Sequence, residues 1–329
     1  MKSIGYSAFG AASDVLEFID LPTPSPKAGE VLVRLTFSGV NPSDVKARSG
    51  SRPGVTKPAF PVIVPHSDGA GVIEAVGGGI EPSRVGQRVW IWNGQWQRAF
   101  GTCAEYIALP ADQAVPLPDD TSDEVGAVLG IPGLTAVHTV LGAGPVAGKT
   151  VLVSGGAGMV GHLAVQIAKA SGAKVIATTS PAKSQIAMDC GADSILDYRA
   201  EDLTDQVLAA NDGALIDHAV EVEFGQNADM LAAVMALNSR IASYGSAQAM
   251  RPEIPFYPMM FKAITLEMAL IYILTDAQRQ LAIANLTSLL QKGAISPRID
   301  PAYAFGDVAK AHEAVEGNTR DGAVLVKTG

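Results

Sequence analysis

The chain has 329 residues, of which 48% are hydrophobic and 17% are charged, and its formal net charge is −9. At roughly 150 residues per domain, this length predicts about two domains with a large buried core, which excludes a disordered protein. The two cysteines, Cys103 and Cys190, exclude a disulfide scaffold and a Cys-x-x-Cys zinc lobe, and the negative charge disfavours nucleic acid as the main partner.

The N-terminal residues contain no apolar signal core. The best candidate for a membrane helix, residues 268–274, is about one strand long and far from the roughly eighteen apolar residues that a span needs. Two cysteines far apart in the chain fit a reducing compartment. The sequence therefore predicts a soluble, cytoplasmic protein.

The first 120 residues or so have the pattern of a β-rich domain. Residues 31–37 alternate in the strand period, residues 69–76 alternate small and apolar side chains, and residues 85–92 form another strand pattern. Clusters of Gly, Pro and Ser interrupt the pattern at residues 22–26 and 50–54. This half is typical of a compact, glycine-rich β-barrel.

The pattern changes near Thr121, which forms a predicted capping box with Glu124 ahead of an apolar run. Residues 149–154 are a β-branched run, a glycine-rich turn follows, and residues 162–171 have helical spacing. Strands and helices then alternate, which predicts a parallel, doubly wound sheet. The later segments are residues 174–178, 194–196, 214–220, 227–237, 240–244, a helix at 276–291 and a last strand at 323–326.

Gly156, Gly158 and Gly161 form a GxGxxG pattern, and Gly155 adds a second glycine spacing. The pattern lies between an apolar strand and a helix, which is the context that dinucleotide binding requires. Glycines there allow a tight turn and a close approach to a pyrophosphate, while N–H groups at the helix start face the phosphates. The alternative is a strand–helix turn that is simply rich in small residues.

The next strand indicates which dinucleotide binds. An NAD site usually presents a carboxylate at the end of this strand. Here the strand ends in Thr178, Thr179 and Ser180, and Lys183 follows without a carboxylate. Hydroxyls and an ammonium suit a ribose 2′-phosphate, and the Tyr-Arg pair at residues 198–199 would close the same pocket. We therefore predict NADP; the alternative is a capped helix start with a solvated lysine.

Further motifs extend along essentially the whole chain. They lie at residues 39–50, 67–77, 86–89, 104–106, 130–136, 190–193, 244–246 and 311–313. With these motifs the chain resembles the medium-chain dehydrogenases/reductases and, among them, the quinone oxidoreductases related to zeta-crystallin. The resemblance implies an α/β protein with a GroES-like β-barrel catalytic domain, residues 1–122 and 274–329, and an inserted doubly wound Rossmann NADP-binding domain, residues 123–273.

The resemblance also implies cofactor contacts, carried over position by position. The implied residues are Asn41 and Thr135 on the nicotinamide side; Gly155, Gly158, Met159 and Val160 at the pyrophosphate; Ser180, Lys183 and Tyr198 at the 2′-phosphate; Tyr244, Gly245 and Ser246 beside the nicotinamide; and Asn318 and Arg320 in the C-terminal stretch.

The chain departs from its relatives at two kinds of position. The Cys and His-Glu ligands of zinc-dependent relatives are missing, so we predict no bound metal and interpret His66 as a loop histidine. Quinone-reducing relatives often have tyrosine where this chain has Lys46 and Arg52. An ammonium at Lys46 would polarise the carbonyl of an enone or enal. The alternative is that Lys46 pairs with Asp44 or is solvated.

The resemblance implies an NADPH:quinone oxidoreductase that transfers hydride to a quinone or an α,β-unsaturated carbonyl without zinc. Asn41 and Lys46 are the candidate catalytic residues, because donors there would stabilise the negative charge that grows on the carbonyl oxygen. Two alternatives stay open: an enoyl or alkenal reductase of the same superfamily, and a non-catalytic NADPH-binding protein of the crystallin type.

The expected partners are a small-molecule substrate and a second copy of the chain, with no nucleic acid and no membrane. Residues 264–273 fall at the expected last strand of the Rossmann sheet and are strongly apolar. An open apolar edge invites aggregation, and pairing across a two-fold axis is the usual solution. We therefore predict a homodimer.

Overall fold

The computed structural model describes residues 1–51, 54–317 and 320–329. These residues divide into two compact units: unit 1 comprises Met1–Ile131 and Pro297–Gly329, and unit 2 comprises Pro132–Ser296. The predicted domain boundaries lie between residues 122 and 123 and between residues 273 and 274, whereas the units divide after Ile131 and after Ser296. Tertiary contacts explain both differences. Asp123 stays with unit 1 because its carboxylate accepts hydrogen bonds from Thr36 Oγ1 and the Arg88 guanidinium. At the other limit, helix α10 (Asp276–Gln291) packs on helix α4 (Leu134–Leu141) inside unit 2.

Unit 1 is built around an antiparallel sheet with the strand order β14-β3-β4-β5-β7, and β6 also pairs with β3. Strands β1 and β2 form a separate antiparallel pair. The long strand β3 explains the predicted alternation, because Val31, Val33 and Leu35 are buried in one core cluster. The strands are β1 (Lys2–Gly5), β2 (Glu17–Asp20), β3 (Glu30–Val40), β4 (Asp68–Val76), β5 (Arg88–Ile91), β6 (Tyr106–Pro110), β7 (Ala114–Pro116) and β14 (Val324–Lys327).

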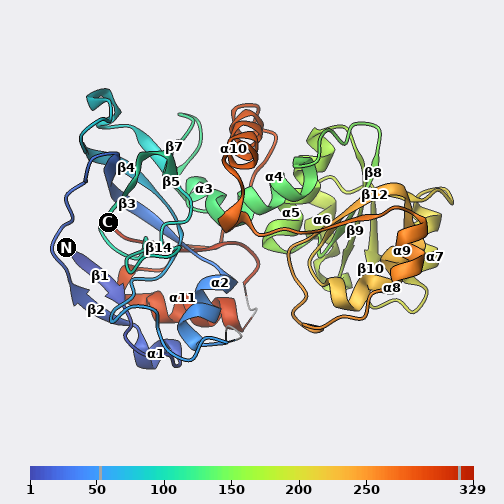
Figure 1. Ribbon diagram of the computed structural model, residues 1–329, viewed down its shortest axis with the longest axis horizontal. Coiled ribbons are helices and arrows are strands. Elements are labelled where there is room, and N and C mark those ends of the chain that lie inside the picture. The colour runs from blue at the N-terminus through green and yellow to red at the C-terminus, as the bar shows by residue number, and fades with distance from the viewer. Residues whose placement is uncertain (52–53, 318–319) are drawn as a thin grey trace. The chain divides into compact units, whose positions relative to one another are not determined.

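Short helices complete unit 1. Helix α11 contacts α1, α2 and β14, and Figure 1 shows α11 beside α2. The predicted cap near residue 121 is shifted by one residue, because Ser122, not Thr121, accepts the N–H of Val125 with its side chain, at 3.3 Å. The helices are α1 (Ala12–Val15), α2 (Pro42–Ser49), α3 (Asp123–Gly126) and α11 (Val308–Glu316), with 3-10 turns at Pro82–Arg84, Ala111–Gln113 and Phe305–Asp307.

Unit 2 contains the predicted parallel sheet, with β8, β9, β10 and β12 labelled in Figure 1. The strand order of the sheet is β10-β9-β8-β11-β12-β13. The strand order reverses between β8 and β11, and ligands bind at such switch points, outside the carboxyl ends of the strands. Strand β8 is buried along its whole length, which agrees with its continuous β-branched sequence. The strands are β8 (Thr150–Ser154), β9 (Lys174–Thr179), β10 (Ser194–Asp197), β11 (Ile216–Glu221), β12 (Met235–Ser243) and β13 (Thr265–Met268).

Contacts group the helices of unit 2 into two sets, with α4, α5, α6 and α10 in one and α7, α8 and α9 in the other. The α5 helix ends where the sequence predicts, since Gly172 has a left-handed φ of 82°. The segment predicted at residues 227–237 is instead divided between α8 and β12. The remaining helices are α5 (Met159–Ala170), α6 (Ser184–Asp189), α7 (Leu203–Ala210), α8 (Phe224–Val234) and α9 (Phe256–Phe261), with 3-10 turns at Pro181–Lys183 and Ile271–Ile273 and a π-type turn at Leu129–Gly133 at the junction of the units.

The structure places β13 at the edge of the parallel sheet, as residues 264–273 predict. Met268, Leu270 and Ile273 are exposed along and after this edge strand. Among the described residues, no helix has both the length and the apolar composition that crossing a membrane would require.

Candidate nucleotide-binding site

The glycine turn joins the carboxyl end of β8 to the start of α5. Gly155 has a φ of 69°, which side chains rarely adopt. A Cβ on Gly161 would lie 2.0 Å from the carbonyl oxygen of Gly155, so only glycine lets the helix approach the turn this closely. A Cβ on Gly158 would meet only that same oxygen, at 3.3 Å, and would project into otherwise open space. The turn is therefore a cradle whose backbone a ligand can approach.

The first backbone hydrogen bond of α5 runs from the His162 N–H to the Gly158 oxygen, at 2.8 Å. The N–H groups of Met159, Val160 and Gly161 therefore lie outside the helical ladder. Such groups, with the positive end of the helix dipole, bind anions. The predicted residues Gly155, Gly158, Met159 and Val160 thus lie together in one turn that fits a pyrophosphate.

The predicted 2′-phosphate residues lie at the carboxyl ends of the two neighbouring strands. Thr179 pairs with Asp197 across β9 and β10, so Ser180 and Tyr198 follow at the same edge of the sheet. Lys183 lies in the turn after β9, and its N–H bonds to the Ser180 oxygen at 2.9 Å. The Arg199 guanidinium lies over the Tyr198 ring, and its Nε donates to the Tyr198 hydroxyl at 3.0 Å. The predicted hydroxyl-bearing and cationic residues therefore follow two neighbouring strands at the same edge of the sheet.

Tyr244, Gly245 and Ser246 follow β12 and bend around the carboxyl end of β11. The Tyr244 N–H bonds to the Glu221 oxygen at 3.0 Å, and the Ser246 hydroxyl accepts the Gly225 N–H at 3.0 Å. A Cβ on Gly245 would lie 2.3 Å from the Val222 oxygen, which explains the glycine. Burial raises the pKa of the Tyr244 hydroxyl, and nearby Glu221 raises it further, so the hydroxyl stays protonated.

Glu221, which was not singled out from the sequence, lies next to the turn at residues 244–246. It is fully buried at the end of β11, where Asn227 Nδ2 donates to both of its carboxylate oxygens, at 3.0 and 3.1 Å, and also to Ser154 Oγ at 3.4 Å. Burial raises the pKa of Glu221, and hydrogen bonds from Glu223 and Asn227 partly oppose the shift. This cluster ties the strand that precedes the glycine turn to α8. In the sequence, the indication of Glu221 is a glutamate at the end of an apolar strand.

Thr135, predicted on the nicotinamide side, lies in α4 within unit 2. It is buried, and its carbonyl oxygen accepts the Thr139 hydroxyl at 2.7 Å. Eleven of the predicted residues therefore lie in unit 2: Thr135, Gly155, Gly158, Met159, Val160, Ser180, Lys183, Tyr198, Tyr244, Gly245 and Ser246.

Asn41 lies in unit 1, between β3 and α2, and two buried carboxylates hold it. Its backbone N–H donates to Asp44 Oδ2 and its side-chain Nδ2 donates to Asp68 Oδ2, each at 2.8 Å. The backbone N–H of Ile131 donates to the same Asp68 oxygen at 3.0 Å. The structure therefore surrounds the predicted residue Asn41 with acceptors that the sequence analysis did not assign to the site.

Asp68 is fully buried at the start of β4. Burial raises the pKa of Asp68 well above its usual range and the nearby Asp44 carboxylate raises it further, while hydrogen bonds from Asn41 and Ile131 lower it in part. Its Oδ1 has no hydrogen-bond partner among the residues that the structure describes. In the sequence, the indication of Asp68 is a carboxylate at the start of a strand of small residues.

The other predicted residues of unit 1 have different surroundings. Lys46 is exposed on α2. Arg320 is partly buried, and burial lowers the pKa of its guanidinium while nearby Asp300 raises it. Asn318 lies outside the described residues, as does Arg52.

His66 does precede β4 in a loop, yet it is fully buried rather than at the surface. Its Nδ1 shares a hydrogen bond with Ser38 Oγ at 2.8 Å, and its Nε2 shares one with His312 Nε2 at 2.9 Å. Cys103 is also buried, and neither cysteine forms a disulfide. Among the described residues, no group of three or more His, Cys, Asp or Glu side chains is placed to hold a metal ion.

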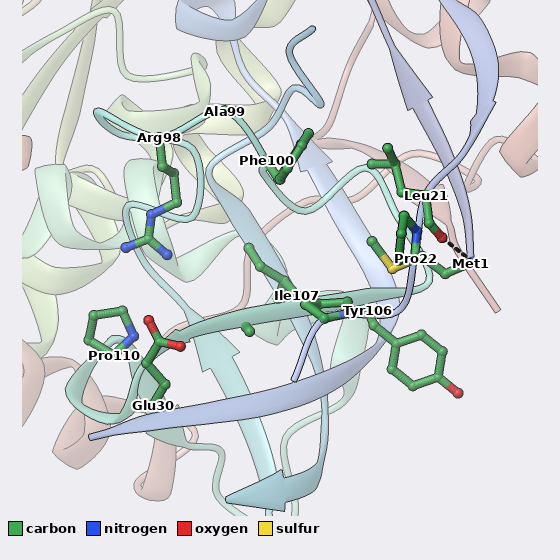
Figure 2. Close-up of a pocket in the computed structure, with 12 residues that line it drawn as sticks. Met1, Leu21, Pro22, Glu30, Arg98, Ala99, Phe100, Tyr106, Ile107 and Pro110 are labelled. Carbon is green, nitrogen blue, oxygen red and sulfur yellow. Dashed lines mark hydrogen bonds between the residues drawn. The ribbon is translucent and has the colours of Figure 1, made fainter. Parts of the chain in front are cut away.

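A cavity of about 590 Å³ lies within unit 1, between β6 and the segments that contain Leu21 and Phe100 (Figure 2). Its lining is mainly apolar, with Arg98 and Glu30 at one end in Figure 2. Arg98 donates to Gln113 Oε1 at 2.6 Å. None of the predicted site residues is among the described residues that line this cavity, so we do not assign it to the nucleotide site.

Comparison with known proteins places the chain in a family. Residues 27–119 match the family described as alcohol dehydrogenase GroES-like domain, and residues 159–288 match the one described as zinc-binding dehydrogenase. The chain is 31% identical to the quinone oxidoreductase of Homo sapiens over 95% of this chain and 93% of the relative. It is 30% identical to that of Sus scrofa over the same shares.

Solved structures agree with this assignment. The mycobacterial protein Rv1454c, complexed with NADPH, is 28% identical and superposes with a TM-score of 0.84 over 99% of this chain and 100% of that one. A quinone oxidoreductase from Pseudomonas syringae is 30% identical, with a TM-score of 0.84 over 99% of both chains. Given the GroES-like barrel, the Rossmann unit and these relatives, the chain belongs to the quinone oxidoreductase family of the medium-chain dehydrogenases/reductases.

Proposed function

We propose that this protein is an NADPH-dependent oxidoreductase that reduces quinones or α,β-unsaturated carbonyls without a bound metal. The observation that carries the proposal is the combination in unit 2 of a glycine cradle with hydroxyl-bearing and cationic residues at the ends of the two neighbouring strands. The cradle lies at the carboxyl end of β8, and Ser180, Lys183 and Tyr198 lie at the ends of β9 and β10. NADPH bound to a structural relative supports the choice of cofactor.

The chain's own residues bind and orient the two ends of the cofactor. The N–H groups of Met159 and Val160 receive the pyrophosphate, and the Lys183 ammonium pairs with the 2′-phosphate in charge-assisted hydrogen bonds. We assign Asn41, Thr135 and the turn at residues 244–246 to the nicotinamide end. NADPH supplies a hydride for an electron-poor carbon of the substrate.

The protein must also stabilise the negative charge that grows on the substrate oxygen and let a proton reach it. We assign this role to Asn41 and Lys46, the two candidate donors of the active site. The exposed ammonium of Lys46 favours enones and enals as a second substrate class beside quinones, because it would polarise an isolated carbonyl. None of these steps needs a Lewis acid, and we propose a zinc-independent reaction.

A substrate panel tests this proposal. Purified protein is incubated with NADPH or NADH and with a quinone, an enone or an enal, before and after dialysis against a chelator. We expect NADPH oxidation that depends on the acceptor, exceeds that of NADH, and is unchanged by chelation. Tight NADPH binding without oxidation by any acceptor would support the non-catalytic alternative instead, and loss of activity on chelation would contradict zinc independence.

We also propose that the chain forms a homodimer in the cytoplasm through the edge strand β13. The exposed side chains of Met268, Leu270 and Ile273 support this assembly, because an open apolar strand edge is an aggregation hazard unless it is paired. The two cysteines, which form no disulfide, fit a reducing compartment. Light scattering at micromolar concentration should give twice the chain mass of 34.0 kDa. A monomer mass would contradict the dimer.

A further inference from the structure

The cavity of unit 1 takes no part in the proposed reaction. Its volume of about 590 Å³ and its mainly apolar lining are typical of a small-molecule pocket. Its floor is the outward face of β6, where Tyr106, Ala108 and Pro110 alternate with Ile107 and Leu109, which are buried in the core. All of the described residues that line the cavity belong to unit 1, so it is built on the barrel alone.

Two side chains of opposite charge lie at one end of this apolar space (Figure 2). Glu30 pairs with Pro110 across β3 and β6, and its Oε2 accepts the Lys27 N–H at 2.9 Å. The Arg98 guanidinium donates to Gln113 Oε1 at 2.6 Å. Among the residues drawn in Figure 2, no hydrogen bond joins Arg98 to Glu30. A charged donor and a charged acceptor therefore lie at the same end of the cavity without bonding to each other.

Arg98 is held in place by its own loop. Its N–H donates to the Gln95 oxygen at 3.2 Å, and its carbonyl oxygen accepts Gln95 Nε2 at 2.9 Å. Gln97, the residue before it, has a left-handed φ of 57°, which is uncommon for a residue with a side chain. Burial lowers the pKa of the Arg98 guanidinium, and the nearby carboxylates of Glu30 and Asp112 raise it. The cation is thus fixed, half-buried and close to negative charge.

These surroundings restrict the polar group of a ligand. An anion would be repelled by the carboxylates of Glu30 and Asp112, and a purely apolar molecule would cover both charged groups without giving them a partner. A hydroxyl group both accepts and donates, so it can bond to the guanidinium and to a carboxylate at once. The rest of the ligand has to be apolar, and the ring of Phe100, which is 45% exposed, favours a flat aromatic body.

We propose that this cavity binds a neutral fused-ring phenol, whose hydroxyl accepts a hydrogen bond from the Arg98 guanidinium and donates one to the Glu30 carboxylate. The rings cover Phe100 and the floor on β6. This site goes beyond the proposed function, because none of the candidate catalytic or cofactor-binding residues is among the described residues that line it. Binding there needs neither NADPH nor hydride transfer.

The test measures the binding of four probes by their fluorescence at about pH 7, where a phenol is neutral. The probes are 2-naphthol; 2-methoxynaphthalene, which accepts a hydrogen bond but cannot donate one; naphthalene, which does neither; and 2-naphthoate, which is an anion. The wild type should bind 2-naphthol about tenfold more tightly than 2-methoxynaphthalene, as expected for one hydrogen bond to a charged partner. It should bind 2-naphthoate no more tightly than naphthalene.

Substitutions locate the binding. Glu30→Met should make the affinities for 2-naphthol and 2-methoxynaphthalene nearly equal. Arg98→Met should weaken 2-naphthol about tenfold and leave naphthalene nearly unchanged. Ala108→Leu should weaken every probe by about tenfold or more, because the added methyl groups occupy the floor, and Ala108→Val fills less space in case Leu distorts the sheet. Arg34→Met is the matched control, since Arg34 lies on β3, pairs with Glu74 at 3.1 Å and is not among the described lining residues.

The account also predicts that Ala108→Leu keeps the thermal midpoint and any NADPH oxidation of the wild type, so the binding result does not depend on catalysis. Unchanged 2-naphthol binding in folded Ala108→Leu and Ala108→Val proteins would place the phenol elsewhere and overturn the proposal. Equal affinities for 2-naphthol and naphthalene would show an unselective apolar cavity, and tightest binding of 2-naphthoate would show an anion site. Either result, or no binding of any probe, would contradict a phenol site.

Discussion

His66 and His312 share a hydrogen bond between their Nε2 atoms, at 2.9 Å, although 246 positions separate them in the chain. Both side chains are fully buried, and their rings are stacked with centroids 5.1 Å apart. The pair joins the segment before β4 to α11 and so ties the C-terminal part of unit 1 to the barrel.

This pair should make the protein less stable in mild acid. Burial lowers the pKa of His66 to about 3, and burial, His66 and Arg48 lower the pKa of His312 well below its usual range. A lowered folded-state pKa means that the unfolded chain binds more protons below about pH 6.5, so stability is full above that pH and is lost as the pH falls. Each such group contributes a slope of about 1.4 kcal/mol per pH unit.

Urea unfolding at pH 7.5, 6.5 and 5.5 measures this slope, and His312→Gln is the comparison because it keeps a donor beside His66 but cannot titrate. As the pH falls, the free energy of unfolding should decrease more steeply in the wild type than in the variant. The difference between the two slopes should correspond to about one proton. His218, whose pKa is lowered to about 4, acts in the same sense, while the raised pKa values of Asp68 and Glu221 act in the opposite sense. His218, Asp68 and Glu221 are present in both proteins, so their contributions cancel in the comparison. Equal slopes for the two proteins would therefore contradict the assignment of the pH dependence to His312.

Lys183→Ala should weaken NADPH binding by about 1.5–3 kcal/mol and leave NADH binding nearly unchanged, because only NADPH carries the 2′-phosphate. Titration with each cofactor measures both affinities. Lys169→Ala is a suitable control, since Lys169 is a lysine of the same unit that pairs with Asp193 at 2.8 Å. The assignment is wrong if both cofactors weaken equally, or if the parent protein prefers NADH.

Two alanine substitutions separate the structural and the ligand-facing glycines of the turn. Gly161→Ala should lower the stability of the free protein by about 1–3 kcal/mol and weaken NADPH binding, because its Cβ would lie 2.0 Å from the Gly155 oxygen. Gly158→Ala should leave the thermal midpoint of the free protein nearly unchanged and weaken NADPH binding alone, since its Cβ has room until a pyrophosphate enters. Equal effects of the two changes on the free protein would count against this distinction.

Lys46→Ala should lower kcat with enones more than it changes NADPH affinity. Loss of a preorganised donor costs about 2.7–4 kcal/mol in a closed site. Lys46 is exposed, so water screens its charge and we expect a smaller decrease, of about tenfold. Steady-state kinetics over the acceptor panel gives the effect, with the exposed Lys292→Ala as control. An unchanged kcat would show that Lys46 does not take part in the reaction.

Local features of the sequence were enough to predict the strands, the turn and the helix that carry the proposed nucleotide-binding residues of unit 2. The glycine spacing, the strand before it and the hydroxyl-rich end of β9 are contiguous in the chain, and the structure places them as expected. These predictions hold because backbone sterics and helix–strand alternation act over a few residues.

The surroundings of Asn41 and His66 could not be predicted in this way. Asp68 reaches Asn41 across 27 positions and His312 reaches His66 across 246, and no periodicity indicates which buried polar groups meet. The domain limits were shifted for a similar reason. The contacts of Asp123 with Thr36 and Arg88, and of α10 with α4, are tertiary contacts that composition does not reveal.

A single-turnover experiment distinguishes hydride transfer without zinc from NADPH binding without catalysis. Metal-free protein saturated with NADPH is mixed with a quinone or an enone, and cofactor oxidation is followed by absorbance, with NADPH deuterated at the transferred position in a parallel run. The proposed zinc-independent hydride transfer predicts oxidation of one NADPH per site, slowed by deuterium. Bound NADPH that stays reduced with every acceptor, or that is oxidised only after zinc is added, would contradict it.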